Sequence, residues 1–172
     1  MKNNAGDSIV IGGGCFWCIE AVFSRIEGVT NAVSGYAGGT IANPSYQEVS
    51  SGLSGHAEVV IVEFEPAAIT LAEILDIFFQ AHDPTTINRQ GADVGPQYRS
   101  IIFYKNEEQK NEIQKAIERA QNDYKNKIVT ELQPLGMIYR AEEYHQDYYE
   151  INKNASYCRL VILPKLQKLK LK

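Results

Sequence analysis

The sequence predicts an α+β fold, a two-layer sandwich in which helices cover a mixed, mainly antiparallel sheet with long site-forming loops. Short β-branched runs alternate with segments whose apolar residues recur at helical spacing, as in βα units packed on one sheet. Polar, glycine-containing stretches at 37–51 and 88–98 are too long for simple connections, so we expect them to build a site.

The first fifty residues contain the clearest alternation of elements. Residues 8–11 are short, apolar and β-branched, as in a buried strand, and apolar spacing predicts a helix over 16–26. Alternation predicts a second strand over 29–36. Pro44 fits the first turn of a short helix, or an irregular loop, over 45–51.

The middle of the chain predicts a strand, a capped helix and another strand. Residues 55–64 have a polar start followed by a continuous β-branched run. An amphipathic helix is expected over 71–79, opened by a capping box of Thr70 and Glu73. A strand follows over 100–104.

The last third predicts two helices around an edge strand. Asn106 can cap a helix whose apolar stripe runs to Tyr124. We expect an edge strand over 127–132 and a last helix over 141–151. The basic tail at 165–172 is expected to be solvated.

Composition indicates a soluble globular protein. Its 172 residues fit a single domain over 1–172, with a polar start at 1–7. A net charge of −4 gives no general attraction to nucleic acid or to anionic membranes. The polar start predicts neither a secretory signal nor a membrane span, and three cysteines favour a reducing compartment, so we expect a cytoplasmic protein. We also expect a monomer.

Cys15 is the strongest candidate for chemistry. It follows the glycine run 12–14 and opens a predicted helix, which places it on a strand-to-helix turn. Unpaired backbone N–H groups and the positive helix end at such a turn favour thiolate, and can lower a cysteine pKa of roughly 8.5 by several units. We therefore expect a nucleophilic thiolate.

Other interpretations of these cysteines remain open. Cys15 and Cys18 form a CxxC pair, which is typical of thioredoxin-like disulfide oxidoreductases. A non-enzymatic thiol or metal-binding module and an inert buried cysteine are further alternatives. A structural zinc site would need two more ligands in a second close pair, so no metal is expected. No such pair is found among Cys158, His56, His82 and His145.

A set of motifs resembles the peptide methionine sulfoxide reductase A family. They are Gly14-Cys15-Phe16-Trp17, Gly35-Tyr36-Ala37-Gly38-Gly39, Asn43-Pro44-Ser45-Tyr46, Gly55-His56-Ala57-Glu58, His82-Asp83-Pro84-Thr85, Asn88-Arg89-Gln90-Gly91, Gln97-Tyr98-Arg99-Ser100 and Tyr144-His145-Gln146-Asp147-Tyr148. Each motif alone is weak, but several in the same order are highly specific. The resemblance covers most of the chain.

The resemblance implies reduction of the S epimer of methionine sulfoxide, free or in oxidised proteins, as a repair reaction in oxidative stress. It implies a ferredoxin-like core, no metal, no bound cofactor, and thioredoxin or another dithiol as external reductant. The residue roles that it implies are Cys15 as nucleophile, Phe16 and Trp17 around the substrate methyl group, Tyr46, Glu58 and Tyr98 at the sulfoxide oxygen, and Asp93 as a second acidic residue.

These roles also make chemical sense without the family. Thiolate attack on a sulfoxide sulfur pushes charge onto oxygen, a poor leaving group until it is protonated. Glu58 begins an apolar strand, where partial desolvation would raise its pKa and keep a proton available. Taken singly, Tyr46 and Tyr98 are more typical of packing residues than of catalytic ones, and Asp93 in its glycine-flanked loop is also typical of a turn-former. His56 is assigned no catalytic role.

Two cysteines are candidates for resolving a sulfenic acid on Cys15. Position 18 is usually glycine in the family, whereas here Cys18 lies one predicted helical turn from Cys15. Cys158 resembles the family's C-terminal resolving cysteine, but a β-branched segment at 159–164 replaces the glycine-rich loop that often follows. We expect Cys18 to react first, with Cys158 as alternative, second relay or unreactive side chain.

Overall fold

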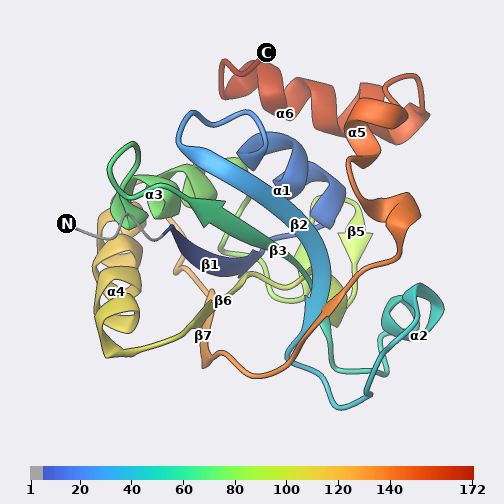
Figure 1. Cartoon of the computed structure of the whole chain (residues 1–172), viewed down its shortest axis with the longest axis horizontal. Coiled ribbons are helices and arrows are strands. Elements are labelled where there is room, and N and C mark those ends of the chain that lie inside the picture. The colour runs from blue at the N-terminus through green and yellow to red at the C-terminus, as the bar shows by residue number, and fades with distance from the viewer. Residues whose placement is uncertain (1–5) are drawn as a thin grey trace.

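The structure of the protein is a computed structural model that describes residues 6–172. Most of the predicted polar start lies outside these residues. Six strands form one curled sheet with the order β7-β6-β1-β3-β2-β8 (Figure 1). They are β1 (Asp7–Gly12), β2 (Val29–Ala37), β3 (Ala57–Phe64), β6 (Ile101–Tyr104), β7 (Glu131–Pro134) and β8 (Ile138–Arg140).

The strand directions confirm the mixed α+β class. Every neighbouring pair in the sheet is antiparallel except β6 and β7, which are parallel. The main helices are α1 (Phe16–Phe23), α3 (Leu71–Ala81) and α4 (Glu107–Gln121). None of the helices within residues 6–172 combines the length and the apolar character that a bilayer crossing requires.

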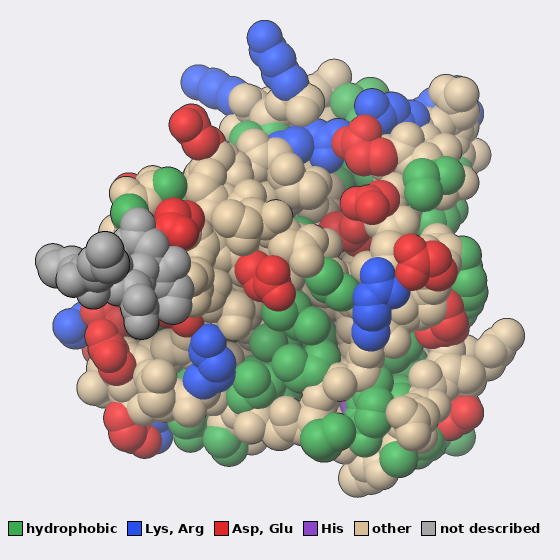
Figure 2. Space-filling model, in the orientation of Figure 1, with side chains coloured by type: hydrophobic (Ala, Val, Ile, Leu, Met, Phe, Trp, Pro, Cys, Tyr) green, Lys and Arg blue, Asp and Glu red, His purple; other side chains and the backbone are tan. Residues whose placement is uncertain are grey.

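The period-two alternation of the strands divides the core between the two faces of the sheet. Ile9 and Ile11 of β1 join the larger cluster, which includes the buried apolar residues of α1, α3 and α4. Val10, between them, belongs to a smaller cluster on the opposite face, with Val59 and Phe103. A hydrophobic area is visible low on the face shown in Figure 2.

The predicted helix starts are confirmed by their caps. The Thr70 side chain accepts from the Glu73 N–H, and the Glu73 carboxylate accepts from the Thr70 N–H, so the capping box is complete. Asn106 caps α4 through the Gln109 N–H. The short-helix alternative was right for α2 (Tyr46–Ser50), although its cap is Ser45. Each cap contributes about 1 kcal/mol.

The edge strands differ from the prediction. The strand expected at 127–132 pairs instead as β7 over 131–134, because the Glu131 N–H donates to the Ser100 carbonyl and sets the register. Pro134 is tolerated since β7 is an edge strand. β8, on the other edge, was not predicted. Three residues paired with β2 carry too short a pattern to stand out in sequence.

The prediction of one continuous helix at 141–151 was wrong. A 3₁₀ turn, η2 (Glu143–His145), and a single helical turn, α5 (Tyr148–Ile151), replace it. Between them Asp147 has φ 52°, which no continuous helix contains. Buried polar groups of β2 and α1 hold this break, so tertiary hydrogen bonds override local helix propensity.

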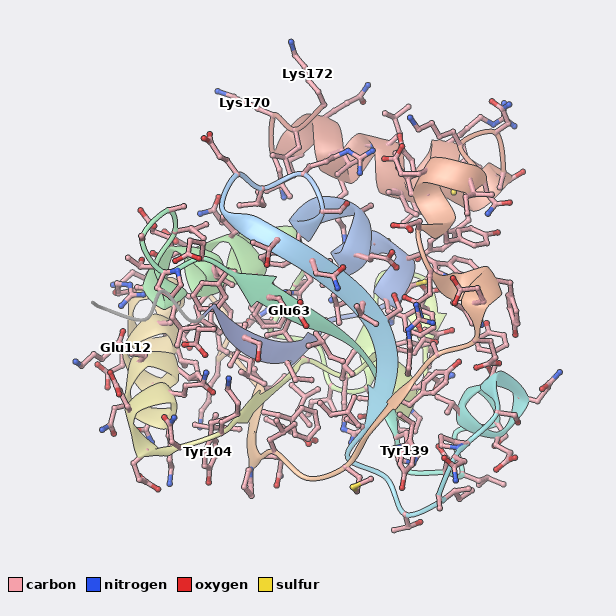
Figure 3. The ribbon with its side chains drawn as sticks, in the orientation of Figure 1. Glu63, Tyr104, Glu112, Tyr139, Lys170 and Lys172 are labelled. Carbon is pink, nitrogen blue, oxygen red and sulfur yellow. The ribbon has the colours of Figure 1, made fainter. Side chains whose placement is uncertain are left out.

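The C-terminal segment is more ordered than predicted. A π-helical turn, η3 (Cys158–Ile162), continues into α6 (Leu163–Lys168), and both pack on α1 (Figure 1). Cys158, Ile162 and Leu166 are buried at helical spacing, a signal present in the sequence. The tail expected to be solvated is therefore partly docked, whereas Lys170 and Lys172 project away from the molecule (Figure 3).

Candidate active site

Cys15 lies where β1 ends and α1 begins, as predicted. It is the N-cap residue of α1 and is 9% exposed. Gly12 brings the end of β1 against β3, since a Cβ there would lie 2.6 Å from the Glu58 carbonyl oxygen. Gly14, with φ 88°, turns the chain back towards the helix. The glycine run therefore places the thiol beside the start of β3.

Glu58 is fixed directly at this turn. Its Oε1 accepts a hydrogen bond of 3.1 Å from the backbone N–H of Phe16, and the residue is 2% exposed. Burial, together with the charge of Asp93, raises the pKa of Glu58 to about 8, although the Phe16 hydrogen bond opposes this shift. The carboxyl thus keeps a proton near neutral pH, as the sequence predicted.

The expected low pKa of Cys15 is not seen in this structure. Burial raises the pKa of the thiol well above its usual range, and the negative charge of Glu58 and the thiol of Cys18 act in the same direction. A hydrogen bond from the Trp17 backbone opposes the shift without reversing it. Desolvation outweighs the helix terminus here, so Cys15 rests as a thiol.

Three predicted polar residues reach the same site from separate loops. Tyr98 belongs to a 3₁₀ turn, η1 (Pro96–Tyr98), and its carbonyl accepts from the Gly14 N–H at 3.2 Å. Tyr46 opens α2, and Asp93 lies in a small hairpin of β4 (Arg89–Gln90) and β5 (Asp93–Val94). Burial raises the pKa of both tyrosines, as do the charges of Glu58, Cys15 and Asp93, so their hydroxyls remain donors.

The aromatic residues after Cys15 form a wall with the C-terminal part of the chain. Phe16 is buried, with its ring centroid 5.0 Å from that of His145. Trp17 stacks on Tyr148 at 3.7 Å and an interplanar angle of 6°. Its Nε1–H donates to Nδ1 of His145 at 3.0 Å. The wall therefore combines residues that lie about 130 positions apart in the sequence.

Tyr157 is a site residue that sequence reasoning missed. Its hydroxyl donates to Asp93 Oδ2 at 2.8 Å and lies 3.5 Å from Cys18 Sγ. The nearby Tyr157 hydroxyl also acts to lower the pKa of Cys15, against the larger effect of burial. His145 and Tyr148 were noted only as part of a motif. For Tyr157 the available signal was its place beside Cys158.

All three cysteines are free thiols and all are buried. The Cys18 N–H donates to the Cys15 carbonyl at 3.1 Å, so the two side chains leave the same first turn of α1. Cys158 is fully buried under α1, next to the tyrosine that contacts Cys18. Within residues 6–172, no three His, Cys, Asp or Glu side chains gather as metal ligands would.

A cavity of about 470 Å³ lies away from this site. It is lined by Gly38, Arg99, Phe103 and Met137, among others, and contains no cysteine. It holds none of the residues that the sequence singled out for chemistry. The candidate site is therefore placed at Cys15 on chemical grounds rather than on cavity size.

The geometry defines a class of protein. A thiol beside a carboxylic acid can attack an electrophilic atom while the acid protonates the atom that departs. Disulfide exchange alone would leave Glu58 and the aromatic wall without a role. The fold and the site are thus those of a thiol-dependent oxidoreductase that acts on an oxygen-bearing substrate.

Comparison with known proteins identifies the family. The model of the peptide methionine sulfoxide reductase family matches residues 7–172, and the chain belongs to this family. "Peptide methionine sulfoxide reductase MsrA 1" of Rhodopirellula baltica is 50% identical over 98% of this chain and 88% of its own length. Mxr1 of Saccharomyces cerevisiae in its reduced form has a TM-score of 0.86 at 36% identity, covering 91% of each chain. The same protein in complex with Trx2 has a TM-score of 0.62 at 30% identity, over 86% of this chain and 87% of that one.

Proposed function

We propose that the protein reduces the S epimer of methionine sulfoxide, free or in proteins, with Cys15 as nucleophile and Glu58 as acid. The observation that carries this proposal is the hydrogen bond from the Phe16 N–H to Glu58. This hydrogen bond holds the Glu58 carboxyl, whose pKa is raised to about 8, at the backbone of the residue that follows Cys15. Membership of the peptide methionine sulfoxide reductase family supports the choice of substrate.

The first step transfers oxygen from the substrate to the enzyme. Cys15 Sγ, having lost its proton, attacks the sulfoxide sulfur while Glu58 protonates the oxygen. The hydroxyl then passes to Cys15 Sγ as the new bond between Cys15 Sγ and the substrate sulfur breaks, which gives methionine and a cysteine sulfenic acid. The sulfoxide is reduced by two electrons and the cysteine is oxidised by two.

The other site residues stabilise this transfer. The hydroxyls of Tyr46 and Tyr98 donate hydrogen bonds that strengthen as the sulfoxide oxygen gains charge. Phe16 and Trp17 receive the methyl group, with a sulfur–aromatic contact worth roughly 0.3–1.5 kcal/mol. Asp93, held by Tyr157, completes the polar side of the site.

This arrangement predicts stereochemical selection. Aromatic faces on one side and hydrogen-bond donors on the other orient one sulfoxide epimer with its sulfur towards Cys15. We expect resolved S-sulfoxide to be consumed at least about 100-fold faster than the R epimer, because an inverted oxygen would lose its donors. Chiral chromatography of each epimer after incubation measures this ratio. Equal consumption would contradict the proposed pocket.

The sulfenic acid is then resolved by a second thiol. Cys18 attacks Cys15 Sγ, a Cys15–Cys18 disulfide forms, and the oxygen departs as water. Cys158 can next attack Cys18, which forms a Cys18–Cys158 disulfide and frees the Cys15 thiol. Thioredoxin, or a dithiol, finally reduces it. The structure of Mxr1 in complex with Trx2 supports this type of reductant.

Peptide mapping distinguishes the two resolving thiols. After one equivalent of sulfoxide under single-turnover conditions, we expect a Cys15–Cys18 link within the first turnover, because both residues belong to one helical turn. That link should persist in Cys158→Ser. A Cys15–Cys158 link that forms as fast in wild type as in Cys18→Ser would contradict this order.

The remaining features of the proposal concern the protein in the cell. We place the reaction on a single domain over 1–172, in a monomer without a bound cofactor. The three free thiols support a reducing compartment such as the cytoplasm, where thiols stay reduced. The substrates are oxidised proteins or free methionine sulfoxide.

One assay separates the proposal from its main alternative. Reduced protein mixed with a methionine sulfoxide and excess dithiol should release methionine continuously, measured by amino-acid analysis. A thioredoxin-like oxidoreductase would instead reduce insulin disulfides and leave the sulfoxide unchanged. That second result would overturn the proposed function.

A further inference from the structure

Trp17 is the only tryptophan of the chain, and one short segment supplies its hydrogen-bond acceptor and its stacking partner, while the Tyr157 ring meets the indole edge-on. The indole N–H donates to His145 at 3.0 Å, and its face stacks on Tyr148 at 3.7 Å. Only Gln146 and Asp147 separate these two partners. The orientation of the indole therefore depends on how those two residues are held.

The break at Asp147 is held from α1. A non-glycine residue with φ 52° persists only where its surroundings compensate for the strain. The Asp147 N–H donates to Glu20 Oε1 at 2.5 Å. Glu20 Oε2 accepts from the Ser34 hydroxyl at 2.6 Å, and the residue is only 3% exposed. A buried carboxyl thus connects α1, β2 and the break.

The Gln146 side chain also links this segment to Ser34, through hydrogen bonds to the Ser34 backbone. Its Oε1 accepts from the Ser34 N–H at 3.0 Å, and its Nε2 donates to the Ser34 carbonyl at 3.0 Å. Nε2 also reaches the Ala141 carbonyl at 3.0 Å. We call Glu20, Ser34 and Gln146 the anchor. The polar side-chain atoms of Glu20 and Gln146 all have hydrogen-bond partners in this region.

We propose that Glu20 is a positioning residue that, through the anchor, fixes the indole of Trp17 in the orientation that receives the substrate methyl group. This inference rests on the proposed role of Trp17. No ion pair to Glu20 is found among the described residues. An apolar side chain would fill this buried position at less cost in desolvation. The two carboxylate oxygens of Glu20 are therefore explained by the hydrogen bonds that they accept from Ser34 and Asp147.

Two substitutions of similar size test the role of the acceptors. In Glu20→Gln the amide carbonyl can still accept from Asp147, and the amide NH₂ can donate to Ser34. Glu20→Leu can do neither. We expect the fluorescence emission of Trp17 in reduced, substrate-free protein to stay as in wild type for Glu20→Gln, and to shift to the red with greater acrylamide quenching for Glu20→Leu.

Kinetics provide the second measurement. Glu20→Leu should raise KM for methionine sulfoxide roughly tenfold and change kcat less than about threefold, since a displaced indole weakens binding without touching the reacting atoms. Glu20→Gln should restore KM to within about twofold of wild type. If Glu20→Leu does not fold, Gln146→Met tests the same anchor and should shift emission and KM in the same direction.

Gln109→Met is the matched control. Gln109 is also a buried glutamine with two side-chain hydrogen bonds, to the Ser8 carbonyl and the Lys105 N–H, but it lies on α4 and contacts neither the site nor the anchor. It should lose stability while leaving the emission and KM unchanged. Anchor variants whose emission matches this control would overturn the inference. A shifted emission with an unchanged KM would uphold the positioning role and contradict the substrate role of Trp17.

Discussion

Cys15→Ser is expected to reduce turnover of methionine sulfoxide by on the order of 10⁴-fold or more, while leaving the fold intact. A serine hydroxyl at neutral pH lacks the nucleophilicity of a thiolate and cannot accept the oxygen as a sulfenic acid. The change is nearly isosteric at a residue without a side-chain capping bond, so the free energy of unfolding should shift by about 1 kcal/mol or less. Methionine release and urea unfolding measure the two effects.

The Cys18→Ser, Cys158→Ser double variant is the control for this loss. It retains Cys15 but has no resolving thiol, so it should release one equivalent of methionine and then stop. Dimedone added after that equivalent should label Cys15 alone, as a trapped sulfenic acid. Multiple turnovers by Cys15→Ser, or a label elsewhere, would remove Cys15 from the proposed role.

Glu58→Gln should slow formation of the sulfenic acid by about 10²–10⁴-fold. The amide can still accept the Phe16 hydrogen bond, so the geometry of the turn should persist. It has no acidic proton to give to the departing oxygen, and proton delivery matters only as the S–O bond breaks. Substrate affinity should therefore change far less than the single-turnover rate. Equal single-turnover rates in the two proteins would exclude Glu58 as the acid.

The pH dependence supplies an independent check of the same residue. The working form has a proton on Glu58 and none on Cys15. Because burial raises the pKa of Glu58 to about 8 and that of Cys15 well above its usual range, the acid is lost before the thiol is fully ionised. The wild-type single-turnover rate should rise with pH up to about 8 and level off above it.

Glu58→Gln should not show this bend. Without a titrating acid at position 58, its slow rate should continue to rise with pH until Cys15 itself ionises. A bend near pH 8 that persists in the variant would assign the titration to another group. The two profiles together therefore separate the acid from the nucleophile.

The Glu58 carboxyl also makes stability depend on pH. Its pKa is raised in the folded protein, so the folded state binds the proton more tightly than the unfolded chain does. This contribution is fully present below the unfolded pKa of about 4.3 and is lost as pH rises through about 8. Glu58→Gln should remove this part of the pH dependence of the free energy of unfolding.

The sequence alone determined what local patterns encode. Short β-branched runs predicted β1 and β3, alternation predicted β2, and the caps at Thr70 and Asn106 marked the starts of α3 and α4. The glycine run before Cys15 indicated a strand-to-helix turn, because that feature depends only on neighbouring residues. The order of the motifs indicated the peptide methionine sulfoxide reductase family, and the family model matches the chain.

The tertiary structure decided what depends on contacts between distant residues. The pKa of Cys15 is raised because burial outweighs the helix terminus, and burial is a property of the whole fold. The break at Asp147 exists because Glu20, 127 positions away, holds its N–H. Tyr157 joins the site because the C-terminal segment packs on α1. A local pattern cannot encode these pairings, since each becomes favourable only after the sheet has brought its partners together.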